Sequence, residues 1–189
     1  MSDSDELGEI NPSLLLLSRF LQMNRKKPPI IKIYEALWCI ADKRIEVQKS
    51  APNLFWNETE IIKAKVFSSS WWKFYEVEFD QLKNQIMSND NGSYWQEYLW
   101  YPSIALLIVQ WKISVINDFI EWLKWIMRKD INTKNKNDFE KTINEVDLFL
   151  VQKWIDIDNF KQVISMIERE IEKMNLSMLW KKRLPPKWY

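Results

Sequence analysis

Apolar and polar residues follow a helical period near the N-terminus, a strand period in the middle and a helical period again towards the C-terminus. A first helix is predicted from Asn11-Pro12, an N-cap followed by proline, and the run Arg25–Pro29 ends it. A second helix is predicted up to Asp42-Lys43, because apolar side chains recur at helical spacing at Ile30, Ile33, Tyr34, Leu37 and Ile40.

The middle of the chain alternates with a period of two, which is typical of β-strands. The alternation is visible at Ile45–Val47, and again in two runs that Ser68–Trp72 separates. The apolar members of these runs are Ala64 and Val66 before the separator, and Tyr75, Val77 and Phe79 after it. This pattern predicts a β-hairpin, followed by a short strand at Ile86-Met87 and a turn at Asn89–Gly92.

The chain has helical spacing again from Ser93, which we interpret as an N-cap. Pro102 opens a buried helix, and a broad apolar face predicts a further helix over Val115–Met127. After a polar linker, two more helices are predicted from Asp138 and Asp158, with apolar faces that match those of an antiparallel hairpin.

This order of elements predicts an α+β fold, with a small antiparallel β-meander packed against mostly C-terminal helices. We expect a disordered acidic N-terminus over residues 1–10 and a core domain over residues 11–128. A helical hairpin over residues 138–174 is expected to pack on that core, and residues 175–189 form a basic tail.

The chain is rich in tryptophan and poor in glycine, with 12 tryptophans and 2 glycines in 189 residues. Several tryptophans stand where a turn or a helix end normally favours glycine, namely Trp71, Trp72, Trp100, Trp111, Trp154 and Trp180. Tryptophan at such a position is costly if its φ is positive, because a side chain disfavours that conformation.

Charge and cysteine content favour an intracellular, cytoplasmic protein. The net charge is +1, and the first nine residues carry acids and no base, whereas the last nine carry bases and no acid. Cys39 is the one cysteine, so an intramolecular disulfide is excluded. The longest apolar run, Ile104–Val109, is far shorter than the roughly 20 residues of a membrane span, so no membrane contact is expected.

The absence of histidine removes the commonest general base and metal ligand. Cys39 and the serine run Ser68–Ser70 therefore have no histidine to activate them, and we interpret them as structural. Glu76 and Glu78 lie on one strand face, about 7 Å apart, as a solvated pair. We predict no enzymatic activity, no cofactor and no metal. An enzyme whose site uses only Asp, Glu, Tyr and Lys is the alternative.

The stretch Ala64–Val109 combines a strand, a serine-rich turn, a strand with Tyr75-Glu76-Val77, a short strand, a turn and a helix. This order resembles the SWIM zinc-binding domain, whose ββα layout carries a Cys-x-Cys pair and a Cys-x-His pair. The four ligand positions fall on Met87, Asn89, Trp100 and Pro102, none of which is a zinc ligand. The resemblance therefore implies a degenerate, metal-free relative of a family associated with DNA binding and protein interaction.

Two binding functions follow from these observations. Exposed tryptophans suit a protein interface, so a binding or scaffold module acting through protein contacts is the leading hypothesis. Nucleic-acid binding is the second, because aromatic and basic side chains stand together in two places. The residues expected to carry it are Trp71, Trp72, Lys73, Lys181, Lys182 and Arg183. The sequence leaves the partner and the oligomeric state open.

Overall fold

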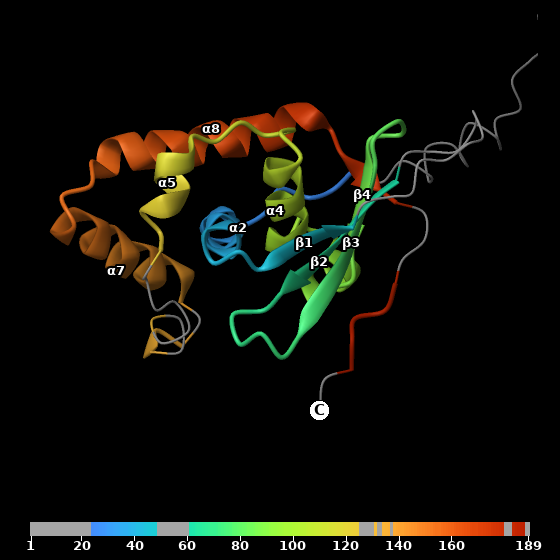
Figure 1. Cartoon of the computed structure of the whole chain (residues 1–189), viewed down its shortest axis with the longest axis horizontal. Coiled ribbons are helices and arrows are strands. Elements are labelled where there is room, and N and C mark those ends of the chain that lie inside the picture. Colours follow the sequence, from blue (N-terminus) through green and yellow to red (C-terminus); the bar gives the residue numbers. More distant parts are fainter. Residues whose placement is uncertain are drawn as a thin grey trace, which may run out of the picture.

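The computed structural model describes residues 24–48, 61–124, 131, 134–136, 138–179 and 183–187. In that part of the chain a five-stranded sheet is combined with six α-helices, which confirms the α+β fold (Figure 1). The helix predicted from Asn11-Pro12 lies outside the described residues, as do Trp180, Lys181 and Lys182.

The sheet contains the predicted β-meander. The strands β1 (Ile45–Gln48), β2 (Ile61–Phe67), β3 (Phe74–Asp80) and β4 (Gln85–Ser88) pair in chain order, and each pair is antiparallel. A fifth strand, β5 (Ser177–Met178), pairs with β4 in parallel. The sequence did not predict β5, because two residues cannot display a period.

One face of the sheet forms part of the core. The register places Ala64 opposite Val77, and Val66 opposite Tyr75. Val66 and Val77 are completely buried, and the Tyr75 ring lies edge-on to Tyr101 with 6.2 Å between ring centroids. Because Tyr101 begins the helix that contains Pro102, this sheet face packs against that helix.

Two buried helices cover this face. Helix α4 (Tyr101–Val109) packs on the sheet, and α2 (Ile31–Ala41) packs on α4 (Figure 1). Both helices are apolar around most of their circumference, as expected of helices enclosed by other elements. Cys39 lies in α2 as a buried free thiol.

The C-terminal helices complete the core. Helix α8 (Ile157–Met174) is amphipathic, and its N-cap Asp156 accepts hydrogen bonds from two backbone N–H groups of its first turn. It contacts α2 and α7 (Phe139–Gln152). The helix predicted over Val115–Met127 is shorter than expected: α5 spans Asn117–Glu121, and residues 125–130 lie outside the described part.

The segment Asn89–Gly92 begins a helix instead of forming a separate turn. Asp90, not Ser93 as predicted, is the N-cap of α3 (Asn91–Trp95), since its Oδ1 accepts a 2.8 Å hydrogen bond from the Ser93 N–H. Asn89 still pairs with β3, because its backbone N–H donates to the Glu76 carbonyl. The sequence pattern was ambiguous because asparagine, aspartate and serine favour both turns and N-caps.

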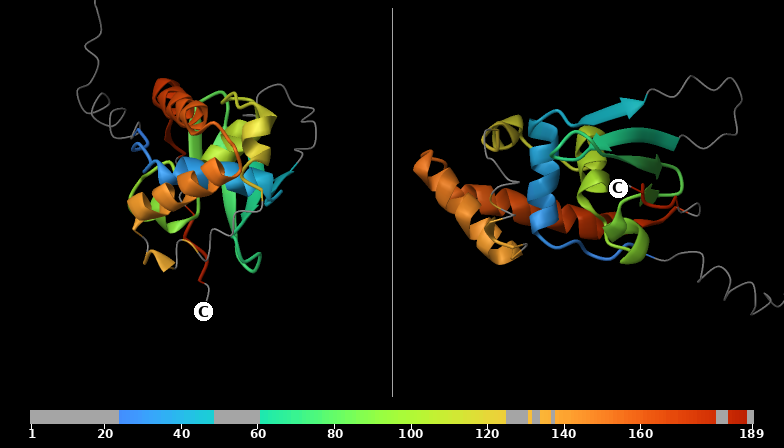
Figure 2. Two further views of the ribbon diagram at one scale, coloured as in Figure 1. Left: turned by 90° about the vertical axis from the view of Figure 1, so that its left-hand side faces the viewer. Right: turned by 90° about the horizontal axis from the view of Figure 1, so that it is seen from below.

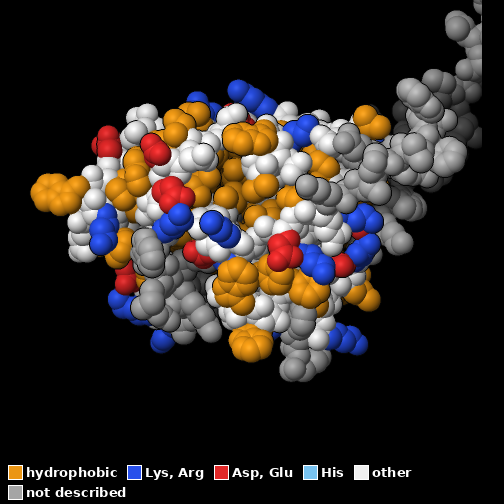
Figure 3. Space-filling model, viewed as in Figure 1, with side chains coloured by type: hydrophobic (Ala, Val, Ile, Leu, Met, Phe, Trp, Pro, Cys, Tyr) orange, Lys and Arg blue, Asp and Glu red, His pale blue; other side chains and the backbone are white. Residues whose placement is uncertain are grey.

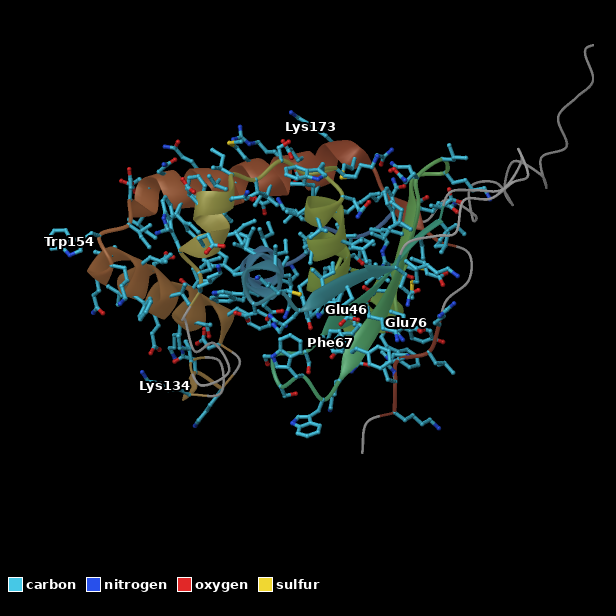
Figure 4. All side chains as sticks on the ribbon, viewed as in Figure 1. Glu46, Phe67, Glu76, Lys134, Trp154 and Lys173 are labelled. Carbon is cyan, nitrogen blue, oxygen red and sulfur yellow. The ribbon has the colours of Figure 1, made fainter. Side chains whose placement is uncertain are left out.

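Three tryptophans hold the left-handed backbone conformation that favours glycine. The φ angles are 63° at Trp71, 57° at Trp111 and 61° at Trp154. Trp111 and Trp154 directly follow the C-caps of α4 and α7, and the residue after each closes the hydrogen-bond pattern of a Schellman motif. Trp100 has φ −80° and is not at such a position. Trp154 is 97% exposed and projects from the α7–α8 connection (Figure 4).

Candidate functional site: an aromatic pocket

An open pocket of about 740 Å³ lies beside α3, and five of its ten lining residues are aromatic. Segments far apart in the chain meet here: residues 24–30, α3 and the beginning of α7 lie on the same side of the molecule (Figure 2). The pocket is lined by Pro29, Tyr75, Asp90, Asn91, Gly92, Trp95, Gln96, Tyr98, Trp100 and Phe139. We call it the aromatic pocket.

Backbone hydrogen bonds hold the rim of the aromatic pocket in place. The Lys26 N–H donates to the Glu97 carbonyl at 3.0 Å, and the Leu99 N–H donates to the Lys26 carbonyl at 3.1 Å. These bonds join the segment before α2 to the connection between α3 and α4. Trp95 remains 69% exposed, so a large apolar side chain stands at the opening.

Lys32 contacts two of the rings that line the aromatic pocket. Its Nζ lies 4.3 Å from the Trp100 ring centroid and 5.1 Å from the Phe139 ring centroid. The same ammonium group donates to both carboxylate oxygens of Glu35 at 2.8 Å. Lys32 is buried, so the ion pair and the ring contacts together compensate for the loss of hydration of its charge.

Asp90 is the acidic residue among those that line the pocket, and its carboxylate faces inward. The residue is 2% exposed, and burial raises the pKa of its carboxyl group. The nearby Arg25 donates to the Ser93 carbonyl at 3.2 Å, and burial lowers the pKa of Arg25 to about 10.

Gly92 allows Trp100 to approach the first turn of α3. A Cβ atom at this position would lie 2.5 Å from Cε3 of the Trp100 ring and 2.7 Å from its Cε2. We expect Gly92→Ala to destabilise the fold by about 1–3 kcal/mol, since the indole must move within a packed site. Chemical denaturation of both proteins measures this, and an unchanged midpoint would contradict the packing described here.

The structure brings only some of the predicted nucleic-acid residues together. Trp71, Trp72 and Lys73 are exposed at the β2–β3 turn, and Trp71 packs on Phe67 with 5.6 Å between ring centroids. Lys181 and Lys182 lie outside the described residues. Charged side chains of both signs are interspersed on the face shown in Figure 3.

Arg183 is engaged within the protein. Its Nη1 lies 2.6 Å from Glu76 Oε2, and its Nη2 lies 2.6 Å from Glu78 Oε1. Glu76 points towards the C-terminal segment (Figure 4). The expectation that this glutamate pair is merely solvated is therefore wrong. The two carboxylates share the outer sheet face because they are two residues apart on β3, and one guanidinium spans them.

The positions implied by the SWIM resemblance have structural roles. Met87 is buried in β4, Pro102 lies in the first turn of α4, and the Asn89 Oδ1 accepts a hydrogen bond from the Glu76 N–H. Within the described ranges, no group of three or more His, Cys, Asp or Glu side chains is arranged to hold a metal ion.

The family comparison covers the whole aromatic pocket. The model of a family described as "Uncharacterised conserved protein UCP014422" matches residues 25–177. The chain belongs to this family. The matched range contains every residue that lines the pocket, whereas Arg183 lies beyond it. Comparisons with curated proteins and with solved structures gave no match. None of the helices among the described residues is long and apolar enough to cross a membrane.

Sequence reasoning did not find the aromatic pocket, although one signal was present. Five aromatic residues stand within the eight-residue stretch Tyr94–Tyr101. Three of them, Trp95, Tyr98 and Trp100, line the pocket. Three further lining residues, Pro29, Tyr75 and Phe139, come from distant segments that only the tertiary fold brings together.

Proposed function

We propose that this protein is a non-enzymatic binding module that receives a segment of a partner protein in the aromatic pocket. The observation that carries this proposal is the open pocket of about 740 Å³ with Trp95 at its rim. Binding energy at protein interfaces concentrates in tryptophan, tyrosine and arginine contacts that fill pockets. The exposed Trp95 offers a tryptophan side chain to a partner, and the aromatic pocket beside it offers a cavity that a partner side chain can fill.

The proposed binding site is tested by selecting peptides from a random library against the purified protein. We expect a family of related peptides that compete with one another, and Trp95→Ala should weaken their binding by about 1–2 kcal/mol or more. Trp154→Ala is the matched control, because Trp154 is an exposed tryptophan outside the pocket. Peptides that bind both variants and the parent equally would show that the pocket is not the binding site.

The second candidate function is nucleic-acid binding at the β2–β3 turn, in keeping with the SWIM-like interpretation. It is favoured by the exposed tryptophans Trp71 and Trp72 next to Lys73. Stacking of a base on such a ring contributes about 1–3 kcal/mol. The engagement of Arg183 by Glu76 and Glu78 reduces the positive charge that the C-terminal segment offers to phosphates.

A fluorescence titration with single-stranded and duplex oligonucleotides at low and physiological salt tests this second function. If it is correct, tryptophan fluorescence is quenched, affinity falls steeply with salt, and Trp72→Ala loses about 1–3 kcal/mol. Absence of quenching at micromolar protein concentrations would leave protein binding as the function.

A further inference from the structure

The walls of the aromatic pocket have the chemistry of a groove for an apolar, extended segment. Tyr98 and Trp100 alternate along the connection between α3 and α4, with ring centroids 5.9 Å apart and planes inclined by 34°. Pro29 and Phe139 extend the apolar surface from other segments. Grooves lined with aromatic rings are the surfaces that accept proline-rich segments in the polyproline II conformation.

Most of the polar side chains of the pocket lining can donate hydrogen bonds as well as accept them. The carboxylate of Asp90 is turned into the fold, where it accepts from the Ser93 N–H. The other polar side chains of the lining are the amides of Asn91 and Gln96 and the hydroxyls of Tyr75 and Tyr98, all of which can donate. A polyproline II segment matches this set, because its carbonyl groups are free acceptors and its prolines lack N–H donors.

The charges next to the lining rings disfavour an ionic ligand group. The Lys32 ammonium already lies over the Trp100 ring, so a cationic side chain approaching that ring would meet a like charge. An anionic group would meet a lysine that is already paired with Glu35, and would lie near the buried Asp90. A neutral segment avoids both penalties.

Granting that the pocket binds a partner protein, as proposed above, we infer that it recognises a proline-rich segment in the polyproline II conformation. Prolines of the segment pack against the exposed surfaces of Trp95 and Tyr98, and its carbonyl oxygens accept hydrogen bonds from the amides and hydroxyls of the lining. The fixed φ angle of proline reduces the conformational entropy that such a segment loses on binding.

The test uses the full-length protein and a polyproline peptide of about ten residues, with calorimetry as the readout. A peptide in which alternate prolines are replaced with glycine is the ligand control. We expect saturable binding of polyproline and at least about tenfold weaker binding of the control peptide. Trp95→Ala and Tyr98→Ala should each lower the affinity for polyproline by at least about tenfold, while Trp154→Ala leaves it unchanged.

The outcomes separate this inference from the proposed function. If library-selected peptides bind at the pocket but polyproline does not, the polyproline inference is overturned and the protein-binding function stands. If neither kind of peptide binds, both are overturned. Polyproline binding that survives in Trp95→Ala and Tyr98→Ala would place the peptide elsewhere and would also overturn the inference. Circular dichroism of each variant confirms that it is folded.

Discussion

Val77→Asp is expected to destabilise the protein by about 3–5 kcal/mol, because it places an unpaired charge in the core. Val77 is completely buried at the centre of the sheet, opposite Ala64 on one side and Ser88 on the other. Neither of these two residues opposite Val77 carries a charge that could pair with the new carboxylate. Urea denaturation followed by circular dichroism gives the difference in the free energy of unfolding.

The control for this prediction is Lys63→Asp. Lys63 is exposed on the outer face of β2, directly opposite Glu78, so this variant carries the same new side chain without burying it. It should lose much less stability than Val77→Asp, and what it loses comes from the lost ion pair of Lys63 with Glu78 and from repulsion between like charges. Equal effects of the two variants would mean that the assignment of the sheet faces is wrong.

Glycine in place of Trp111 and Trp154 is expected to stabilise the fold by about 0.5–1.5 kcal/mol at each position. Both residues hold a left-handed φ in Schellman motifs, with 78% and 97% of their surfaces exposed. Their side chains therefore contribute little burial while their backbones are strained. The gain should be smaller at Trp71, since its contact with Phe67 is lost.

The triple variant Trp71→Gly/Trp111→Gly/Trp154→Gly should gain roughly the sum of the single effects, because the three tryptophans lie on separate connections, after β2, α4 and α7. Each kcal/mol corresponds to about 2–4 °C in the thermal midpoint for a protein of this size. Trp72→Gly is the matched control: Trp72 is 86% exposed but is not among the residues with positive φ. It should bring no gain, and a gain equal to that of Trp154→Gly would contradict the backbone explanation.

Local patterns predicted most of the fold. The alternation around Tyr75, Val77 and Phe79 was sufficient to assign the meander and its buried face, because one face of the sheet is covered and the other is open. The excess of tryptophan over glycine indicated strained positions, and three of them are at positive φ. These features depend on residues close together in the chain.

Features that depend on distant segments could not be predicted. Strand β5 is two residues long, and only its pairing with β4 defines it. The Arg183 contact with Glu76 joins residues 107 positions apart. The aromatic pocket combines Pro29, Tyr75 and Phe139 with the α3 region, and no single period or spacing links these residues. The α3 N-cap was misplaced for a local reason, because Asn, Asp and Ser residues such as Asp90 and Ser93 favour both turns and N-caps.

The protein-binding role of the aromatic pocket is tested most directly by site-specific photo-crosslinking in the cells that produce the protein. Tyr98→p-benzoylphenylalanine places the reactive group in the pocket wall, and Trp154→p-benzoylphenylalanine places it on a remote exposed loop. We predict a discrete crosslinked partner protein from position 98 that is absent from position 154. No crosslink at position 98, or the same species from both positions, would contradict the proposed function.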